Sequence, residues 1–328
     1  MAAEIYLVSG FLGAGKTTFI QKMLDEVFRD DKVVLIENDF GEIGVDAALL
    51  KSSGVEVTEI NAGCICCSLS GDFVKALKEL LERFRPDKIV IEPSGVAKLS
   101  DIIKVCHDPR IMPLAEVRAK ITVVDVKRCK TYLDNFGEFF EDQIQNADII
   151  LLSRAEDLSG KVNYAYELVK NLNDHARIVV DPWDEITAAE ILSLKRTYSD
   201  YADGYGCGHE HYESENGCCG HEHHEGENGC CEHEHGHLAE KVFDTLTIRT
   251  RQVFTTEDLR AKVSRMEKSA NGNILRAKGI VRAAGGYMDL QYLPGDISIK
   301  KCSTRGDMLC IIGQNLNRQE LISLFNGE

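Results

Sequence analysis

A glycine-rich segment near the start of the chain has the residue types and the spacing of a phosphate-binding loop. Residues 10–17 read Gly-Phe-Leu-Gly-Ala-Gly-Lys-Thr, which fits the pattern G-x-x-x-x-G-K-S/T. The glycines let backbone N–H groups turn towards a phosphate, and a helix that starts here adds partial positive charge. Lys16 is expected to reach the outer phosphates, and the Thr17 hydroxyl to bind Mg²⁺. We therefore predict a nucleoside triphosphate site, rather than a plain glycine-rich turn, at Gly10, Gly13, Ala14, Gly15, Lys16, Thr17 and Thr18.

An acidic loop is predicted directly after the second apolar run of the chain. Residues 37–44 read Glu-Asn-Asp-Phe-Gly-Glu-Ile-Gly, and three carboxylates lie within six of these residues. Such oxygens are able to contact Mg²⁺, position a water molecule or bind a second metal ion. We expect Glu37 and Glu42 to be metal ligands and Glu42 to act in catalysis as well. A solvated acidic loop without a ligand role is the alternative.

Three cysteines within four residues form a compact group of soft ligands, called here the cysteine cluster. Residues 61–68 read Asn-Ala-Gly-Cys-Ile-Cys-Cys-Ser and lie between a predicted strand and a predicted helix. A helix N-terminus favours the thiolate form that binds metal. We expect Cys64, Cys66 and Cys67 to bind Zn²⁺, with a fourth position left for water or a carboxylate. Small buried residues in a tight turn, or a redox C-x-x-C pair of Cys64 and Cys67, are the weaker alternatives.

A further acidic residue follows the apolar run at residues 89–91. Residues 92–95 read Glu-Pro-Ser-Gly. A carboxylate at the end of a buried strand beside a phosphate loop is suited to hold Mg²⁺ through water, and Gly95 could donate its N–H to the γ-phosphate. The expected catalytic residues are therefore Lys16, Glu92 and Glu42.

The segment after the apolar run at residues 149–152 is where a nucleotide base would be recognised. Residues 153–158 read Ser-Arg-Ala-Glu-Asp-Leu and take the place of an Asn-Lys-x-Asp motif. Arg154 could lay its stem along a purine, and Glu156 could accept hydrogen bonds from the guanine amino and ring N–H groups. We expect Ser153, Arg154 and Glu156 to bind the base, but the departures from the motif leave ATP open beside GTP.

The composition changes abruptly over residues 200–240. Eight of the ten histidines and five of the twelve cysteines lie between residues 207 and 237, where a Glu-Asn-Gly-Cys-Cys-x-His-Glu-His unit occurs twice. With almost no apolar residues, this segment cannot form a core, and we expect it to be disordered without metal. Its thiolates and imidazoles favour Zn²⁺, Ni²⁺, Co²⁺ or copper, and an acidic flexible linker is the alternative. The expected ligands are Cys207, His209, His211, Cys218, Cys219, His221, His223, Cys230, Cys231, His233 and His235.

Most of these residues follow short apolar runs, which must belong to one sheet if the side chains are to meet. The runs are residues 5–8, 33–36, 55–60, 89–91, 121–124, 149–152 and 178–180, with amphipathic helical stretches between several of them. This alternation predicts an α/β fold, a P-loop NTPase with a doubly wound and mostly parallel sheet. Ligands of such sheets bind beyond the carboxyl ends of the strands, where the residues above are expected.

The charge balance argues against nucleic acid and anionic membranes as partners. The 328-residue chain has a formal net charge of −15, and residues 203–237 hold nine acidic residues with no Lys or Arg. The N-terminus lacks the basic region of a signal peptide, and no apolar run is long enough to span a membrane. We therefore expect a cytoplasmic protein whose cysteines are mostly thiols, available as metal ligands.

These motifs resemble those of the CobW-like P-loop GTPases, a family of metallochaperones and metal-insertion factors. The resemblance rests on residues 10–18, 37–44, 63–67, 92–95, 123–125 and 143–148, and on Arg276-Ala277-Lys278-Gly279 near the C-terminus. The Cys-x-Cys-Cys sequence inside a P-loop domain is its most specific part. The resemblance implies a chain that hydrolyses GTP with Mg²⁺, handles a transition metal and serves a client metalloprotein. Zn²⁺ is preferred as that metal, with cobalt, nickel or iron as alternatives.

The chain is expected to divide into three parts. Residues 1–198 would form the P-loop GTPase domain, residues 199–240 the metal-binding linker, and residues 241–328 a small α+β domain like the C-terminal domain of the family. In the last part, strand-like runs at 242–248, 273–282, 287–293, 296–301 and 308–313, with helices from about 256 and 318, predict an antiparallel sheet. We expect a docking or regulatory role for it. The remaining cysteines, Cys106, Cys129, Cys302 and Cys310, are expected to be core or incidental thiols.

The leading hypothesis is a GTPase that controls metal transfer. Binding of Mg²⁺-GTP would order the acidic loop and bring Glu37 or Glu42 near the cysteine cluster, and hydrolysis would relax the loop and release the metal to a client. A metal buffer or storage protein that uses the His- and Cys-rich segment is a second hypothesis, and a P-loop ATPase or kinase is a third. The sequence leaves the oligomeric state open, with a homodimer as one option.

Overall fold

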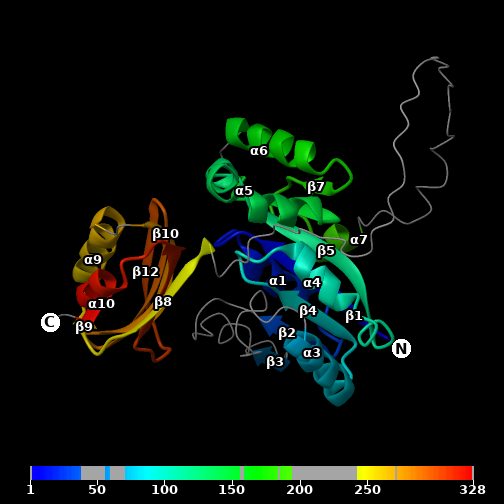
Figure 1. Ribbon diagram of the computed structural model, residues 1–328, viewed down its shortest axis with the longest axis horizontal. Helices are drawn as coiled ribbons and strands as arrows, with labels where there is room; N and C mark the ends of the chain where they lie inside the picture. Colours follow the sequence, from blue (N-terminus) through cyan, green and yellow to red (C-terminus); the bar gives the residue numbers. More distant parts are fainter. Residues whose placement is uncertain are drawn as a thin grey trace, which may run out of the picture. The chain divides into compact units, whose positions relative to one another are not determined.

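The computed structural model describes residues 2–37, 56–59, 71–155, 159–183, 185–193, 242–269 and 272–326 (Figure 1). The acidic loop beyond Glu37, the cysteine cluster and the His- and Cys-rich segment lie outside these residues. The described chain has an α/β part up to residue 193 and an α+β part from residue 242. Within the described residues, no helix is both long enough and apolar enough to cross a membrane.

In the α/β part, the described strands form one seven-stranded parallel sheet in the order β3-β2-β4-β1-β5-β6-β7. The strands are β1 (Ala3–Gly10), β2 (Val33–Glu37), β3 (Glu56–Glu59), β4 (Lys88–Glu92), β5 (Ala115–Asp125), β6 (Ile149–Ser153) and β7 (Arg177–Val179). Glu37 at the end of β2 lies opposite Glu92 of β4, and Asp125 of β5 lies opposite Ser153 of β6. The sheet therefore gathers polar residues at its carboxyl edge, where such folds bind ligands.

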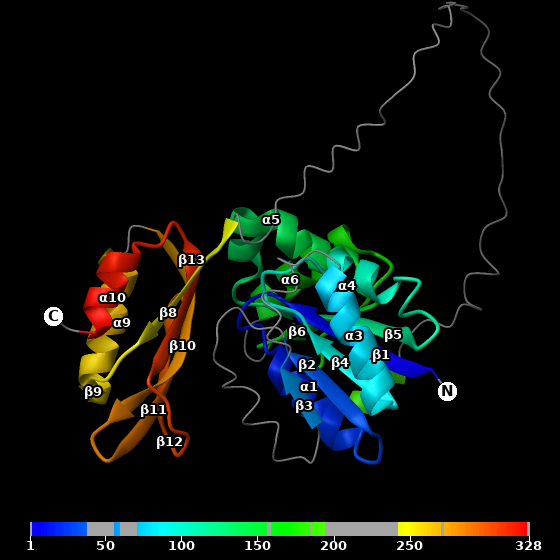
Figure 2. The ribbon, with the colours of Figure 1, turned by 60° about the horizontal axis from the view of Figure 1, so that its bottom comes forward.

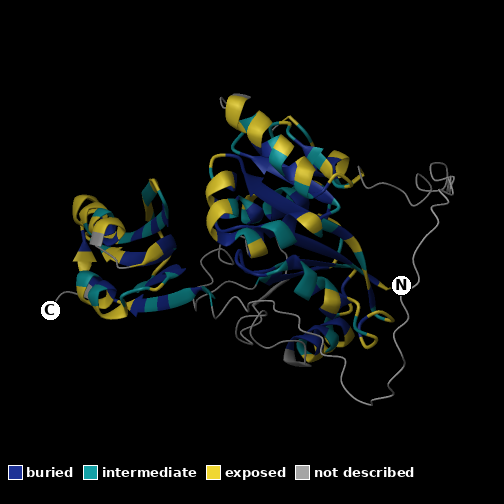
Figure 3. Ribbon diagram, turned by 45° about the horizontal axis from the view of Figure 1, so that its top comes forward, coloured by how far each residue is buried: buried dark blue, intermediate teal, exposed yellow. Residues whose placement is uncertain are grey.

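Helices lie on both faces of this sheet (Figure 2). They are α1 (Lys16–Glu26), α3 (Gly71–Phe84), α4 (Leu99–Cys106), α5 (Cys129–Gln145), α6 (Ser159–Leu172) and α7 (Ala188–Ser193). Along β1, Tyr6 and Val8 contribute to a core with α1 and α7, whereas Ile5 and Leu7 contribute to a core with α3 and α4. The strands β1, β2, β4 and β6 are mostly buried, and the exposed residues lie mainly on the helices (Figure 3). This arrangement confirms the predicted doubly wound α/β class.

The described residues of the α+β part form a mostly antiparallel sheet and two helices. Its described elements are β8 (Asp244–Arg249), β9 (Val253–Phe254), α9 (Thr256–Ser269), β10 (Asn273–Ala283), β11 (Gly286–Leu293), β12 (Asp296–Cys302), β13 (Met308–Gln314) and α10 (Arg318–Asn326). The strand order is β12-β11-β10-β13-β8, and the short β9 pairs parallel with β10. Leu259 and Val263 of α9 and Phe325 of α10 share a core with Leu290 of β11. The predicted α+β fold with an antiparallel sheet is confirmed.

β5 is longer than the apolar pattern predicts. The run at residues 121–124 predicts a short strand, but β5 already begins at Ala115. In its first half, the exposed side chains of Glu116 and Arg118 alternate with more buried neighbours. Because this half pairs with β1 without forming a continuous apolar run, its strand character is hard to see in the sequence.

Four cysteines lie in the described part of the chain, and all four are free thiols. Cys106, Cys129 and Cys310 are buried, and Cys302 is partly exposed. Burial raises the pKa of the Cys106 thiol to about 12, so this group stays protonated at neutral pH. These residues have the burial expected of core or incidental thiols.

Candidate functional site

The phosphate loop connects β1 to α1 and requires glycine where it leaves the strand. Gly10 has φ of 140°, and a Cβ on this residue would lie 2.3 Å from the backbone oxygen of Val123. α1 begins at Lys16, with Gly15 as its N-cap residue in a left-handed conformation. The first backbone N–H groups of the helix have no carbonyl partner within it, and an anion is a suitable ligand for them.

Three of the predicted catalytic and Mg²⁺-binding residues lie together beside this loop. The buried Lys16 ammonium donates to the backbone oxygen of Gly10 at 3.1 Å and lies 3.8 Å from Glu92 Oε1. Thr17 Oγ1 lies within hydrogen-bonding distance of both Glu92 carboxylate oxygens, at 3.4 Å from each. Hydroxyl and carboxylate oxygens are ligands that Mg²⁺ prefers, so the donor set of Thr17 and Glu92 fits this ion.

The segment that follows β4 lies directly against the phosphate loop. A Cβ on Gly95 would lie 2.8 Å from the backbone nitrogen of Leu12, so glycine permits the close approach. Gln143 of α5 holds the segment, because its Nε2 donates to the backbone oxygens of Gly95 at 3.2 Å and Ala97 at 2.8 Å. Gly95 is therefore next to the loop, and its hydrogen bond to a γ-phosphate stays a prediction.

Of the three residues predicted to bind the base, the two that lie in the described part of the chain, Ser153 and Arg154, both contact the phosphate loop. Ser153 is buried, and its Oγ donates to the backbone oxygen of Ala14 at 2.7 Å and lies 3.3 Å from that of Val124. Arg154 has φ of 59°, and its guanidinium donates to the backbone oxygen of Gly13 at 3.1 Å. Both residues support the loop in this structure, and their role in binding a base stays a prediction.

Replacing Ser153 by alanine is expected to lower the free energy of unfolding by about 1 kcal/mol, because the buried Ala14 carbonyl loses a donor. Chemical denaturation of the variant and the wild type measures this difference. Ser193→Ala is a matched control, since Ser193 is exposed and its hydroxyl donates to the backbone oxygen of Glu190 within the short helix α7. This control should change stability by less than about 0.5 kcal/mol. Equal stability of Ser153→Ala and the wild type would contradict the supporting role.

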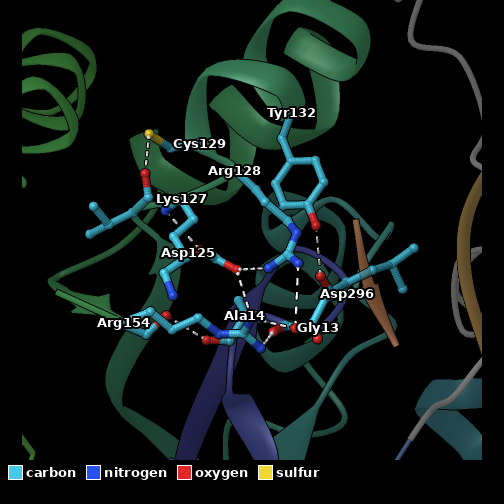
Figure 4. A network of polar contacts seen from close by, with 12 residues as sticks. Gly13, Ala14, Asp125, Lys127, Arg128, Cys129, Tyr132, Arg154 and Asp296 are labelled. Atoms are coloured by element: carbon cyan, nitrogen blue, oxygen red, sulfur yellow. Dashed lines mark hydrogen bonds and ion pairs between the residues drawn. The ribbon is translucent and has the colours of Figure 1, made fainter. Parts of the chain in front are cut away.

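An ion-pair network that the sequence does not predict lies beside the loop (Figure 4). The side chain of Asp125 is fully buried, and its Oδ2 lies 2.7 Å from Arg128 Nη1 and 3.6 Å from Arg154 Nη1. Asp296 of β12 lies 3.6 Å from both guanidinium groups. The spacing of Asp125 and Arg128 is visible in the sequence as an i, i+3 pair, but nothing there relates Asp296 to them. The network connects the phosphate loop, through Arg154, to the second sheet.

An aromatic cluster supports the same loop from the protein interior. The ring centroid of Phe11 lies 4.3 Å from that of Tyr132 and 5.5 Å from that of Phe136. The Tyr132 hydroxyl donates to the backbone oxygen of Leu12 at 3.1 Å, and burial raises the pKa of this hydroxyl, which keeps it a donor. Phe243, which precedes β8, places its ring centroid 5.3 Å from that of Phe136. The residue before the first strand of the α+β part therefore packs against the aromatic cluster that supports the phosphate loop.

A pocket of about 810 Å³ opens beside these residues, and its lining includes Lys16, Thr17, Glu92 and Arg154. Its volume lies in the range of small-molecule and cofactor sites. With a cation, a hydroxyl and a carboxylate on one wall, the pocket has the groups needed to bind a phosphate together with a divalent cation.

Several predicted site residues lie outside the described part of the chain. They are Glu42, Cys64, Cys66, Cys67, Glu156 and the expected ligands from Cys207 to His235. Within the described ranges, no three His, Cys, Asp or Glu side chains are grouped so that they could hold a metal ion. The soft-metal sites therefore stay predictions.

Relatives named as zinc chaperones match part of this chain. The zinc chaperone CobW of Sinorhizobium sp. is 34% identical over 218 residues, which cover 57% of this chain and 61% of that protein. The zinc chaperone YeiR of Escherichia coli (strain K12) is 35% identical over 150 residues, which cover 46% of each chain. The match therefore spans about half to three-fifths of the length of these relatives. The structure of the Zn(II)-bound YjiA GTPase from E. coli is similar over 99% of this chain and 98% of that chain, with 18% identity and a TM-score of 0.45.

Two family models match the two described parts. The model of the CobW/HypB/UreG nucleotide-binding domain matches residues 4–180. The model of the cobalamin synthesis protein CobW C-terminal domain matches residues 243–327. Since the first model covers more than half of the chain, this protein belongs to the CobW/HypB/UreG family.

Proposed function

We propose that this protein is a GTP-hydrolysing metallochaperone, which binds a transition metal at its cysteine cluster and delivers the metal to a client protein. The observation that carries the proposal is the meeting of Lys16, Thr17 and Glu92 at one pocket in a chain of the CobW family. Zn²⁺ is the proposed cargo, because three thiolates suit this ion and because relatives named as zinc chaperones match the chain.

In this proposal the phosphate loop holds the nucleotide. The backbone N–H groups at the start of α1 bind phosphate oxygens, and Lys16 turns its ammonium from the Gly10 carbonyl to the outer phosphates. Thr17 and Glu92 hold Mg²⁺, which when bound neutralises part of the charge on the phosphate oxygens. Glu42 is the proposed group that positions the attacking water.

The order of the strands supports a coupling between nucleotide and metal. β3 ends at Glu59, which lies opposite Glu37 of β2, and Glu37 in turn lies opposite Glu92 of β4. The cysteine cluster begins at Cys64, a few residues beyond the end of β3. We therefore propose that occupation of the phosphate site changes the metal site through Glu37 and the acidic loop, as γ-phosphate contacts do in other nucleotide switches.

A metal buffer is the second candidate, because residues 207–237 contain thirteen Cys and His residues. A buffer would bind several metal ions per chain and would keep its full capacity in a Lys16→Ala variant. A chaperone of the proposed kind would bind at least one metal ion whose affinity depends on the nucleotide.

Nucleotide hydrolysis with GTP and with ATP, measured across a panel of metal ions, tests the proposal. We expect hydrolysis of GTP in the presence of Mg²⁺, a rate that changes on addition of Zn²⁺, and little hydrolysis of ATP. Equal rates with the two nucleotides would favour an ATPase, and the absence of any hydrolysis would favour the buffer.

A further inference from the structure

The second sheet has one apolar face and one polar face. Along β11, Met288, Leu290 and Tyr292 belong to the core that includes α9 and α10. Because side chains alternate along a strand, the residues between them lie on the opposite face. The polar side chains of the second sheet that line the pocket beside the phosphate loop are Arg276, Asp289, Gln291, Asp296, Ser298 and Lys300, called here the polar face.

Contacts join this side of the sheet to the phosphate loop. A Cβ on Gly13 would lie 2.5 Å from Cδ1 of Leu293, which shows how closely the end of β11 approaches the loop. Asp296 lies 3.6 Å from Arg154, and Arg154 donates to the Gly13 backbone oxygen. Residues of the phosphate loop and of the polar face therefore line one pocket.

The charges in the pocket indicate what the polar face binds. Lys16 and Arg154, the cations on the loop side, already lie beside carboxylates. Arg276 and Lys300 form no ion pair with any side chain in the described part of the chain. A nucleoside triphosphate brings several negative charges into this pocket, and Arg and Lys are the side chains that bind phosphate most strongly.

We propose that the polar face forms the second wall of the nucleotide site and that Arg276 and Lys300 bind the phosphate groups of the nucleotide. The inference rests on the proposed binding of GTP and adds the residues of the α+β part that recognise it. Arg276 is half-buried and Lys300 is exposed, so neither side chain is locked by packing and both are free to adjust to a ligand. Nucleotide binding then joins the two sheets through a shared ligand.

Equilibrium binding of fluorescent GTP and ATP analogues to the full chain, in the presence of Mg²⁺, tests this inference. Arg276→Ala and Lys300→Ala are each expected to weaken binding of the GTP analogue by about tenfold, the usual cost of a lost hydrogen bond to a charged group. Lys301→Ala is a matched control, because Lys301 is the next residue of β12, is exposed and does not line the pocket. The affinity of the Lys301→Ala variant for the GTP analogue should stay within about twofold of that of the wild type.

The outcomes separate this inference from the proposed function. If the wild type binds the GTP analogue and Lys300→Ala and Arg276→Ala bind it equally well, the inference is wrong and the proposed function stands. If the wild type binds neither analogue, the proposed function fails and the inference fails with it. Circular dichroism checks the fold of each variant, and Lys300→Ala decides the test if Arg276→Ala does not fold, because Lys300 is exposed.

Discussion

Replacing Lys16 by alanine is expected to slow GTP hydrolysis by on the order of 10²–10³-fold. The Lys16 ammonium is buried, donates to the Gly10 carbonyl and lies 3.8 Å from Glu92, so it lies beside the phosphate loop, from which we propose that it turns to the outer phosphates. Phosphoryl transfer depends on such fixed positive charge, because negative charge spreads over the phosphoryl oxygens in the transition state. The rate of phosphate release at saturating GTP measures the effect.

Lys22→Ala provides the matched control for this experiment. Lys22 lies on the same helix as Lys16, but it pairs with Glu26 and does not line the pocket. Its rate should stay within about twofold of the wild type. A Lys16→Ala variant that keeps the wild-type rate would show that the phosphate loop does not catalyse the hydrolysis.

A second large effect is expected from Lys278, a buried lysine of β10. Burial lowers the pKa of this ammonium to about 8, against smaller electrostatic effects of Cys310 and Glu37, which raise it. In the unfolded chain the group regains its ordinary pKa of 10.5. Between these two values the unfolded state binds more protons than the folded state, so stability must rise with pH across this window. The free energy of unfolding is expected to rise by about 3 kcal/mol from pH 8 upwards.

Urea denaturation of the wild type and of Lys278→Met, repeated from pH 7 to pH 10.5, isolates this contribution. The difference in the free energy of unfolding between the two proteins should shrink by about 3 kcal/mol as the pH rises. The wild type gains stability because the Lys278 ammonium loses its proton, whereas the variant has no ammonium at this position. Lys301→Met is the control, because Lys301 is exposed. The free energy of unfolding of this variant, plotted against pH, should run parallel to that of the wild type. If the stability curve of Lys278→Met also runs parallel to that of the wild type, the Lys278 side chain is not buried in its charged form.

The fold could be predicted because its signals are local. Each apolar run predicts a strand by itself, and the phosphate loop is a motif of eight consecutive residues. The first half of β5 was missed for the same reason, because Glu116 and Arg118 interrupt the local pattern although pairing with β1 makes the segment a strand.

The part of the site that depends on distant residues could not be predicted. The burial of Asp125 between Arg128 and Arg154 depends on the packing of β5 and β6. The alternation along β11 and β12 indicates which residues share a face, but it does not indicate that this face meets the phosphate loop. Arg154 is a second example. Its predicted contact with a purine does not indicate that its guanidinium donates a hydrogen bond to the Gly13 backbone oxygen.

The proposed control of the metal site by the nucleotide is tested by the Zn²⁺ affinity of the full chain in two nucleotide states. Competition with a chelator would be measured with Mg²⁺ and either a non-hydrolysable GTP analogue or GDP. Because the His- and Cys-rich segment also contains metal ligands, the Cys66→Ser variant serves as the matched background. We expect the tightest wild-type site to bind Zn²⁺ on the order of tenfold more strongly with the GTP analogue than with GDP, and this difference to vanish in Cys66→Ser. Equal Zn²⁺ affinity in the two nucleotide states, or a difference that survives in Cys66→Ser, would contradict control of the cysteine cluster by the nucleotide.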